Sequence, residues 1–214
     1  MKNNLIKVCG LTLPENVDAV CSLGVDFLGF IFYPPSPRYT IGKASAAELI
    51  RAAGNVLKTG VFVDHPLNEL LKIAHIYQLD VFQLHGNESP ETCFALRQSH
   101  QVIKAFPVAG VDDFDRVSAY QGACDYFLFD TKGPRHGGNG TPFDWNILDS
   151  YTGDTPFLLS GGIRPEDAGK LNKLSHSKLA GFDLNSRFET SPGLKNIDLL
   201  NTFLDQLRSP KASI

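Results

Sequence analysis

Two side chains that can move protons stand directly after apolar runs of the sequence. Cys9 follows residues 5–8, and Asp130 follows residues 126–129. A thiol with a tuned pKa can serve as a base or a nucleophile, and a carboxyl group that burial keeps protonated can serve as an acid. Each also has a simpler explanation: Cys9 as buried packing, and Asp130 as a helix cap or the partner of a lysine. The two are a candidate acid–base pair if the fold brings these run ends together.

Charged side chains that suit a polar ligand also follow apolar runs. Arg38 ends a proline-stiffened loop, and its planar guanidinium suits a carboxylate, although a solvated loop cation is the alternative. His85 ends another run, where a structural histidine is the more frequent explanation, and Asp183 ends the last one. All three are candidate binding residues.

Two short polar loops near the end of the chain are typical of phosphate binding. Gly161 and Gly162 follow one apolar run, and Asn185 and Ser186 come shortly after the next. Backbone N–H groups of such loops bind phosphate in many barrels, and the alternative for the glycine pair is a simple tight turn. A further glycine-rich loop at 137–140 is either a lid over the substrate or a mobile surface loop.

The elements that must position these residues are eight apolar runs spread along the chain. The runs are near-continuous rather than alternating, as expected of parallel strands covered on both faces. The predicted strands are residues 5–9, 27–32, 57–63, 81–84, 102–108, 126–130, 157–160 and 179–183.

Segments with helical signals separate these runs. A broad apolar stripe marks residues 66–77, and a cap followed by a proline marks Ser89-Pro90. Other helices are predicted to begin at Pro14, Asp144 and Arg164, and the last to cover 194–207.

Eight strand-then-helix units predict a single-domain α/β protein, a (β/α)8 TIM barrel of the phosphate-binding type over residues 1–214. A doubly wound open sheet is the alternative, and it fits less well because no G-x-G-x-x-G follows the first strand. In a barrel, the active site lies at the carboxyl ends of the strands. The chemically capable residues above would then converge on one opening.

The bulk composition excludes several classes of function. The 214 residues are 43% hydrophobic and 20% charged with a net charge of −3, which is ordinary for a soluble protein and gives no sign of nucleic-acid or membrane binding. No apolar run approaches the roughly 20 residues of a membrane span, and no signal-peptide segment opens the chain. Four scattered cysteines lack metal-ligand spacing. We therefore expect a cytoplasmic protein with reduced thiols and no metal site.

Several motifs coincide with the candidate residues. They include Lys7-Val8-Cys9-Gly10-Leu11-Thr12, Ser36-Pro37-Arg38, Gln83-Leu84-His85-Gly86, Phe129-Asp130-Thr131 and Leu159-Ser160-Gly161-Gly162-Ile163. In this combination, the chain from residue 5 to about 196 resembles the phosphoribosylanthranilate isomerase family of tryptophan biosynthesis, whose fold is the (β/α)8 barrel.

This resemblance implies a reaction, the conversion of N-(5-phosphoribosyl)anthranilate to 1-(2-carboxyphenylamino)-1-deoxyribulose 5-phosphate. It implies Asp130 as the general acid that opens the ribose ring, and Cys9 as the general base that removes the C2 proton. No metal or organic cofactor is implied, because the iminium itself accepts the electron pair.

The resemblance also assigns binding residues for a small phosphorylated substrate. It implies that Arg38 pairs with the anthranilate carboxylate. Further substrate contacts are expected from His85, Asp183 and Arg187, with Asp183 directed to the sugar hydroxyls. The phosphate would be bound by Gly161, Gly162, Asn185 and Ser186.

The chain departs from the family pattern in the loop after the eighth strand. Where the family usually has Asp-x-Ser-Ser-Gly-Val-Glu, Arg187 replaces the glycine. A non-glycine residue is strained there if the position needs a positive φ, and our hypothesis is that Arg187 adds a phosphate contact, so that Arg187→Gly raises KM. Asn139, in place of the usual Thr or Ser, is a milder change.

Three alternatives to the isomerase remain at this point. Another phosphosugar isomerase or epimerase would need more histidine and aspartate ligands at strand ends, and an indole-forming synthase would need catalytic lysines there. A catalytically silent phosphate-binding barrel has no need of both Cys9 and Asp130. A monomer is the default oligomeric state, with a homodimer as the alternative.

Overall fold

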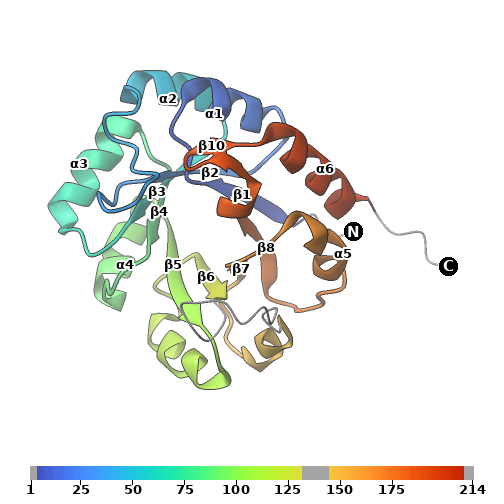
Figure 1. Cartoon of the computed structure of the whole chain (residues 1–214). Helices are drawn as coiled ribbons and strands as arrows, with labels where there is room; N and C mark the ends of the chain where they lie inside the picture. The colour runs from blue at the N-terminus through green and yellow to red at the C-terminus, as the bar shows by residue number, and fades with distance from the viewer. Residues whose placement is uncertain (1–3, 132–144, 210–214) are drawn as a thin grey trace.

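The chain forms a closed barrel of eight parallel strands. The computed structural model describes residues 4–131 and 145–209, and Figure 1 looks down the barrel. The strands are β1 (Leu5–Cys9), β2 (Phe27–Ile31), β3 (Leu57–Phe62), β4 (Val81–Leu84), β5 (Gln101–Val108), β6 (Tyr126–Thr131), β7 (Phe157–Ser160) and β8 (Leu179–Leu184). Because β1 pairs with β8 as well as with β2, the predicted barrel is confirmed and the open sheet is wrong.

Helical segments surround the barrel on its outer face (Figure 1). Ser89 caps α4 as predicted, since its side chain accepts a hydrogen bond from the Thr92 N–H. In the described parts of the connections after β5 and β6, the helical segments are 3-10 helices. The segments are α1 (Pro14–Cys21), α2 (Ala46–Ala53), α3 (Leu67–Tyr77), α4 (Pro90–Arg97), η1 (Val111–Tyr120), η2 (Trp145–Ser150), η3 (Pro165–Asp167), α5 (Ala168–Leu171) and α6 (Ile197–Arg208).

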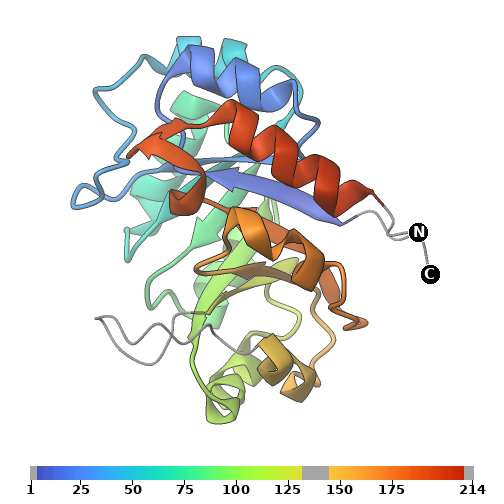
Figure 2. The ribbon, with the colours of Figure 1, turned by 45° about the vertical axis from the view of Figure 1, so that its right-hand side comes forward.

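The last part of the chain differs from the prediction of one helix over 194–207. After β8 come the short 3-10 helix η4 (Ser186–Phe188) and a hairpin of β9 (Glu189–Ser191) and β10 (Leu194–Lys195), and α6 begins only after the cap residue Asn196. Gly193, with φ of +91°, provides the turn of that hairpin. Figure 2 shows α6 lying between α1 and α5, so that the last helix closes the outer ring beside the first.

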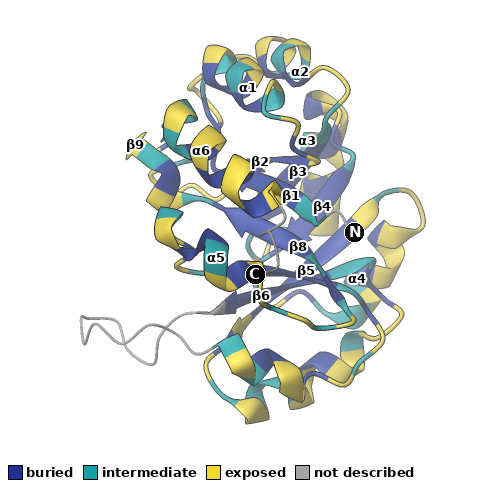
Figure 3. Ribbon diagram, turned by 90° about the vertical axis from the view of Figure 1, so that its right-hand side faces the viewer, coloured by how far each residue is buried: buried dark blue, intermediate teal, exposed yellow. Residues whose placement is uncertain are grey.

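The core has two layers, one on each side of the strands. Phe27, Val81, Ile103, Ala105, Leu128 and Leu158 form a cluster that fills the barrel interior. A larger cluster lies between the outer faces of the strands and the helices, and Figure 3 shows buried strands surrounded by helices with exposed outer faces.

The interior layer determines what lies above it. Side chains two positions apart on a strand point to the same side. Leu128 and Leu158 fill the barrel interior, and two positions later Asp130 and Ser160 line a cavity. The two-residue alternation along each strand therefore places polar side chains at the carboxyl ends of the strands, next to the apolar cluster in the barrel interior.

Candidate active site

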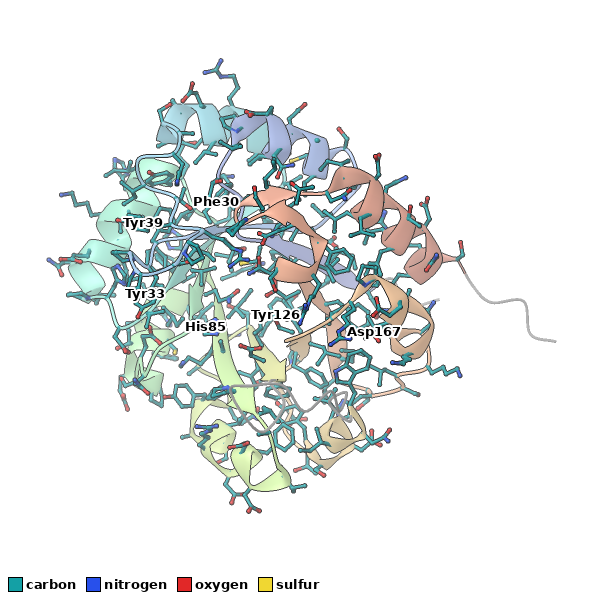
Figure 4. All side chains as sticks on the ribbon, in the orientation of Figure 1. Phe30, Tyr33, Tyr39, His85, Tyr126 and Asp167 are labelled. Carbon is teal, nitrogen blue, oxygen red and sulfur yellow. The ribbon has the colours of Figure 1, made fainter. Side chains whose placement is uncertain are left out.

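A cavity of about 260 Å³ lies at the carboxyl ends of the strands. All the site residues predicted from the sequence line it except Arg38. Figure 4, viewed in the direction of Figure 1, places His85 near the barrel opening. The residues that line the cavity are Cys9, Ile31, Val61, Gln83, His85, Asp130, Ser160, Gly161, Gly162, Ile163, Asp183, Asn185, Ser186 and Arg187.

Cys9 contributes a buried thiol from the end of β1. Its Cα pairs with Gly29 of β2, and a Cβ added to Gly29 would lie only 2.6 Å from the Cys9 sulfur. The glycine therefore makes room for the thiol. Burial raises the pKa of the Cys9 thiol, although the ammonium groups of Lys7 and Lys195 oppose that rise.

Lys7 and Asp183 form a buried ion pair beside Cys9. They are direct partners in the β1–β8 register, and the Lys7 Nζ donates a hydrogen bond to Asp183 Oδ1 at 2.8 Å. The Ser160 hydroxyl donates to Asp183 Oδ2 at 3.2 Å, so the protein contacts both carboxylate oxygens. Sequence reasoning missed Lys7 because it lies within the strand, although its place two residues before Cys9 puts both on one face.

Asp130 faces the cavity from β6, close to the imidazole of His85. The His85 Nε2 lies 3.6 Å from Asp130 Oδ2, and its Nδ1 lies 3.1 Å from the Gln83 Nε2. One ring nitrogen of His85 thus contacts the Gln83 amide, and the other faces Asp130. Gln83, also missed from the sequence, is 1% exposed, and its Oε1 has no hydrogen-bond partner among the described residues.

Arg38 lies beside the cavity and binds a carboxylate of the protein itself. Its Nε donates to both oxygens of Glu189, at 2.9 and 3.0 Å, and its Nη2 donates to Oε2. The Lys195 Nζ donates to Glu189 Oε1 at 2.7 Å and to Asn185 Oδ1 at 2.9 Å. Burial raises the pKa of Glu189, but Arg38 and Lys195 together outweigh it and hold that pKa below its ordinary value.

The loops after β7 and β8 form the rim of the cavity. Gly161 and Gly162 have φ of +89° and +67°, a conformation that favours glycine. Arg187 is exposed and lies in η4. Because Asp64 and Gln78 are the non-glycine residues with positive φ in the described chain, the strain considered for Arg187 is wrong. The arginine fits this loop because a 3-10 turn needs no left-handed residue.

Part of the sequence prediction falls outside the described residues. The glycine-rich loop at 137–140, with Asn139, lies outside the described residues, as does the predicted helix start at Asp144. Within 4–131 and 145–209, no group of three or more His, Cys, Asp or Glu side chains could hold a metal ion. None of the helices in that same part of the chain is long and apolar enough to cross a membrane.

Comparison with known proteins gives a consistent result. A family model described as N-(5'phosphoribosyl)anthranilate (PRA) isomerase matches residues 6–206. The chain is 46% identical over 212 residues to the N-(5'-phosphoribosyl)anthranilate isomerase of Parabacteroides distasonis, covering 96% of this chain and 94% of that protein. It is 44% identical to the Phocaeicola vulgatus protein of the same name, covering 95% and 98%.

Solved structures of the same name share the fold. The phosphoribosyl anthranilate isomerase of Thermotoga maritima matches with a TM-score of 0.82 and 31% identity, covering 96% of this chain and 98% of that chain. A phosphoribosyl anthranilate isomerase in complex with reduced 1-(o-carboxyphenylamino)-1-deoxyribulose 5-phosphate matches with a TM-score of 0.79 and 29% identity, with the same coverage.

Proposed function

Because this chain belongs to the N-(5'-phosphoribosyl)anthranilate isomerase family, we propose that Cys9 and Asp130 are the base and the acid of its reaction. The protein is an isomerase of tryptophan biosynthesis and converts N-(5'-phosphoribosyl)anthranilate to the corresponding deoxyribulose phosphate. One observation carries the assignment of roles: both side chains line one cavity, from β1 and β6.

Asp130 begins the reaction as general acid. It gives its proton to the ribose ring oxygen as the bond from that oxygen to C1 breaks, which leaves a protonated Schiff base. His85 supports this role, because its imidazole lies beside the acid, with Nε2 3.6 Å from Asp130 Oδ2. His85 and Gln83 therefore orient the acid.

Cys9 completes the reaction as general base. Its thiolate takes the proton from C2, and the electron pair of that C–H bond forms the C1=C2 bond while the iminium electrons move to nitrogen. The resulting enolamine then tautomerises to the ketone. Each side chain has changed protonation state once, and exchange with solvent restores both. These steps need no metal or organic cofactor, because the iminium is the electron acceptor.

Arg38 binds the substrate carboxylate with the N–H groups that Glu189 leaves free. Glu189 holds Nε and Nη2, so the Nη1 side of the fork is available. At the other side of the cavity, Gly161, Gly162, Asn185 and Ser186 bind the phosphate, and Arg187 adds a positive charge at the rim. Asp183 accepts hydrogen bonds from the sugar hydroxyls while it pairs with Lys7.

The same proposal covers partners and location. The substrate is a small phosphorylated molecule, as the complex of the solved relative supports. We place the enzyme in the cytoplasm, as a single domain over residues 1–214. A monomer is proposed, with a homodimer as the alternative, because one solved Thermotoga maritima relative is described as monomers generated from a dimeric enzyme.

The test is an assay with phosphoribosylanthranilate generated in situ, following the loss of its fluorescence. Turnover by the wild type and losses of about 10² to 10⁴ in kcat in both Cys9→Ala and Asp130→Asn would support both roles. Full activity of either variant would remove that residue from its role. A silent barrel would bind the product without turnover in the wild type.

A further inference from the structure

Lys7 is a fully buried cation next to Cys9. Its side chain is 0% exposed, and it lies two residues before Cys9 on the same face of β1. A buried ammonium needs a partner, because desolvation otherwise favours the neutral amine. Asp183 is that partner: despite burial, it raises the pKa of Lys7, so the ammonium stays charged.

The ion pair is anchored so that the ammonium has a fixed position. Lys7 and Asp183 are register partners of adjacent strands, and the Ser160 hydroxyl donates to the second carboxylate oxygen. These contacts involve β1, β7 and β8, three rigid elements of the barrel. Strand positions hold side chains more firmly than loops do. The positive charge thus lies beneath the cavity, beside the thiol.

We propose that Lys7 is a positioning residue for the proton transfer at Cys9: its buried ammonium, held by Asp183, stabilises the thiolate that removes the substrate proton. This inference rests on the role proposed for Cys9. A thiolate in a site closed to water needs a nearby cation, because water does not stabilise its charge. Lys7 provides this charge without touching the substrate.

The other charged groups around Cys9 are either paired with other residues or repel the thiolate. Lys195 also attracts the thiolate, but it donates to Glu189 and Asn185, and Arg38 is held by Glu189. Asp183 repels a thiolate, and that repulsion is weaker than the attraction of Lys7. Across the cavity, Asp130 and His85 face each other. Lys7 is therefore the largest single influence that opposes the rise in the pKa of Cys9.

The experiment compares the pH dependence of kcat/KM for the wild type, Lys7→Met and Lys7→Arg. The rate rises with pH as Cys9 loses its proton. Lys7 opposes the rise in the pKa of Cys9 more than any other group, and loss of a nearby opposite charge moves a pKa by about one unit or more, so we expect the rising limb of the Lys7→Met profile to move up by at least about one pH unit. At pH values below the limb, this shift corresponds to a loss of about tenfold in kcat/KM. Lys7→Arg keeps the charge and should restore the wild-type limb.

A second readout does not depend on turnover. The ultraviolet absorbance of the Cys9 thiolate is titrated as the difference between each protein and the same protein with Cys9→Ala. This titration should move upward in Lys7→Met together with the kinetic limb. Equal loss of activity at every pH, with the thiolate titration unmoved, would show a structural role only and overturn the proposal.

Lys104 offers a matched control elsewhere in the barrel. It is 2% exposed and lies 3.4 Å from Glu88, and its Nζ donates to the carbonyl oxygens of Leu84 and Gly86, so its ammonium has partners that include neither Asp183 nor Cys9. Lys104→Met should lower the thermal stability and leave the pH limb in place. An upward shift in Lys104→Met equal to that of Lys7→Met would also overturn the proposal.

Two controls cover the cases in which Lys7→Met does not fold or the base is not Cys9. If Lys7→Met fails to fold because Asp183 is left unpaired, Lys7→Met with Asp183→Asn removes both buried charges, and a smaller upward shift is expected because attraction by Lys7 exceeds repulsion by Asp183. Cys9→Ala separates the two proposals. Retained turnover in Cys9→Ala contradicts the base assignment itself, whereas a dead Cys9→Ala with an unmoved limb in Lys7→Met contradicts the role of Lys7 alone.

Discussion

Arg38 holds both carboxylate oxygens of Glu189, a residue 151 positions further along the chain. The Glu189 side chain is 4% exposed and also accepts a hydrogen bond from Lys195. The contact connects the loop after β2 to the β9–β10 hairpin. The arginine that we propose as the carboxylate receptor is therefore held in place before the substrate arrives.

Glu189→Gln should weaken substrate binding. Without the carboxylate, the guanidinium loses the charge-assisted bonds that orient it, and we expect KM to rise about tenfold, equivalent to the roughly 1.5 kcal/mol of one such bond, with kcat nearly unchanged. Steady-state kinetics measures the two constants. Glu88→Gln, which removes another buried carboxylate that pairs with a lysine, should leave KM unchanged. A lower KM in Glu189→Gln would show that Glu189 competes with the substrate.

The lowered pKa of Glu189 predicts that the protein loses stability in acid. The pKa of Glu189 is lower in the fold than its ordinary value of 4.5, so its stabilisation is complete above pH 4.5 and is lost as the pH falls through the lower folded value. Thermal unfolding from pH 7 to pH 3 should show the wild type more stable than Glu189→Gln at neutral pH. The gap should narrow below about pH 4.5. A gap that is constant with pH would contradict this prediction.

Gly29→Ala should reduce both activity and stability. The added Cβ would lie 2.6 Å from the Cys9 sulfur and 2.8 Å from the Cys9 Cα, so the thiol and the end of β1 must both move. A displacement of about 1 Å at a reacting group costs on the order of 10²-fold in rate, while overpacking costs about 1–3 kcal/mol of stability. Measurements of kcat and of thermal unfolding separate these effects. Gly110→Ala is the control, because nothing lies within 4 Å of its added Cβ.

Gln83→Leu should slow the acid-catalysed step. The leucine removes the amide that contacts the His85 ring at Nδ1, the nitrogen that does not face Asp130. The loss of one such hydrogen bond is about 1 kcal/mol, so we expect kcat to fall about fivefold while KM changes little. The kcat of His85→Asn should fall by a similar factor. The kcat of the double variant should fall little further, because the two residues act as a unit. Additive losses would show independent roles.

Arg187→Gly should raise KM for the phosphorylated substrate. Arg187 is exposed at the rim of the cavity, so its contribution is modest, and we expect an increase of up to about fivefold that shrinks as salt is added. Arg164→Gly is the control, because that arginine is also exposed and does not line the cavity. An unchanged KM at low salt would exclude a phosphate contact by Arg187.

The sequence by itself determined the order of the strands and most of the cavity lining. Apolar runs are local patterns, and in a parallel barrel the end of each run reaches the same opening, so Cys9, Asp130 and Gly161 could be brought together without coordinates. Short motifs carried the family resemblance for the same reason, since each lies at a single strand end.

Only the tertiary structure decided which charges pair. Lys7 meets Asp183 across 176 positions, and Arg38 meets Glu189 across 151. No local pattern encodes these partners, because they depend on the closure of β8 onto β1 and on the β9–β10 hairpin, whose second strand lies where the sequence predicted the start of a helix. The sequence therefore named the groups that we propose to transfer protons, and the closed barrel determined the charges that surround them.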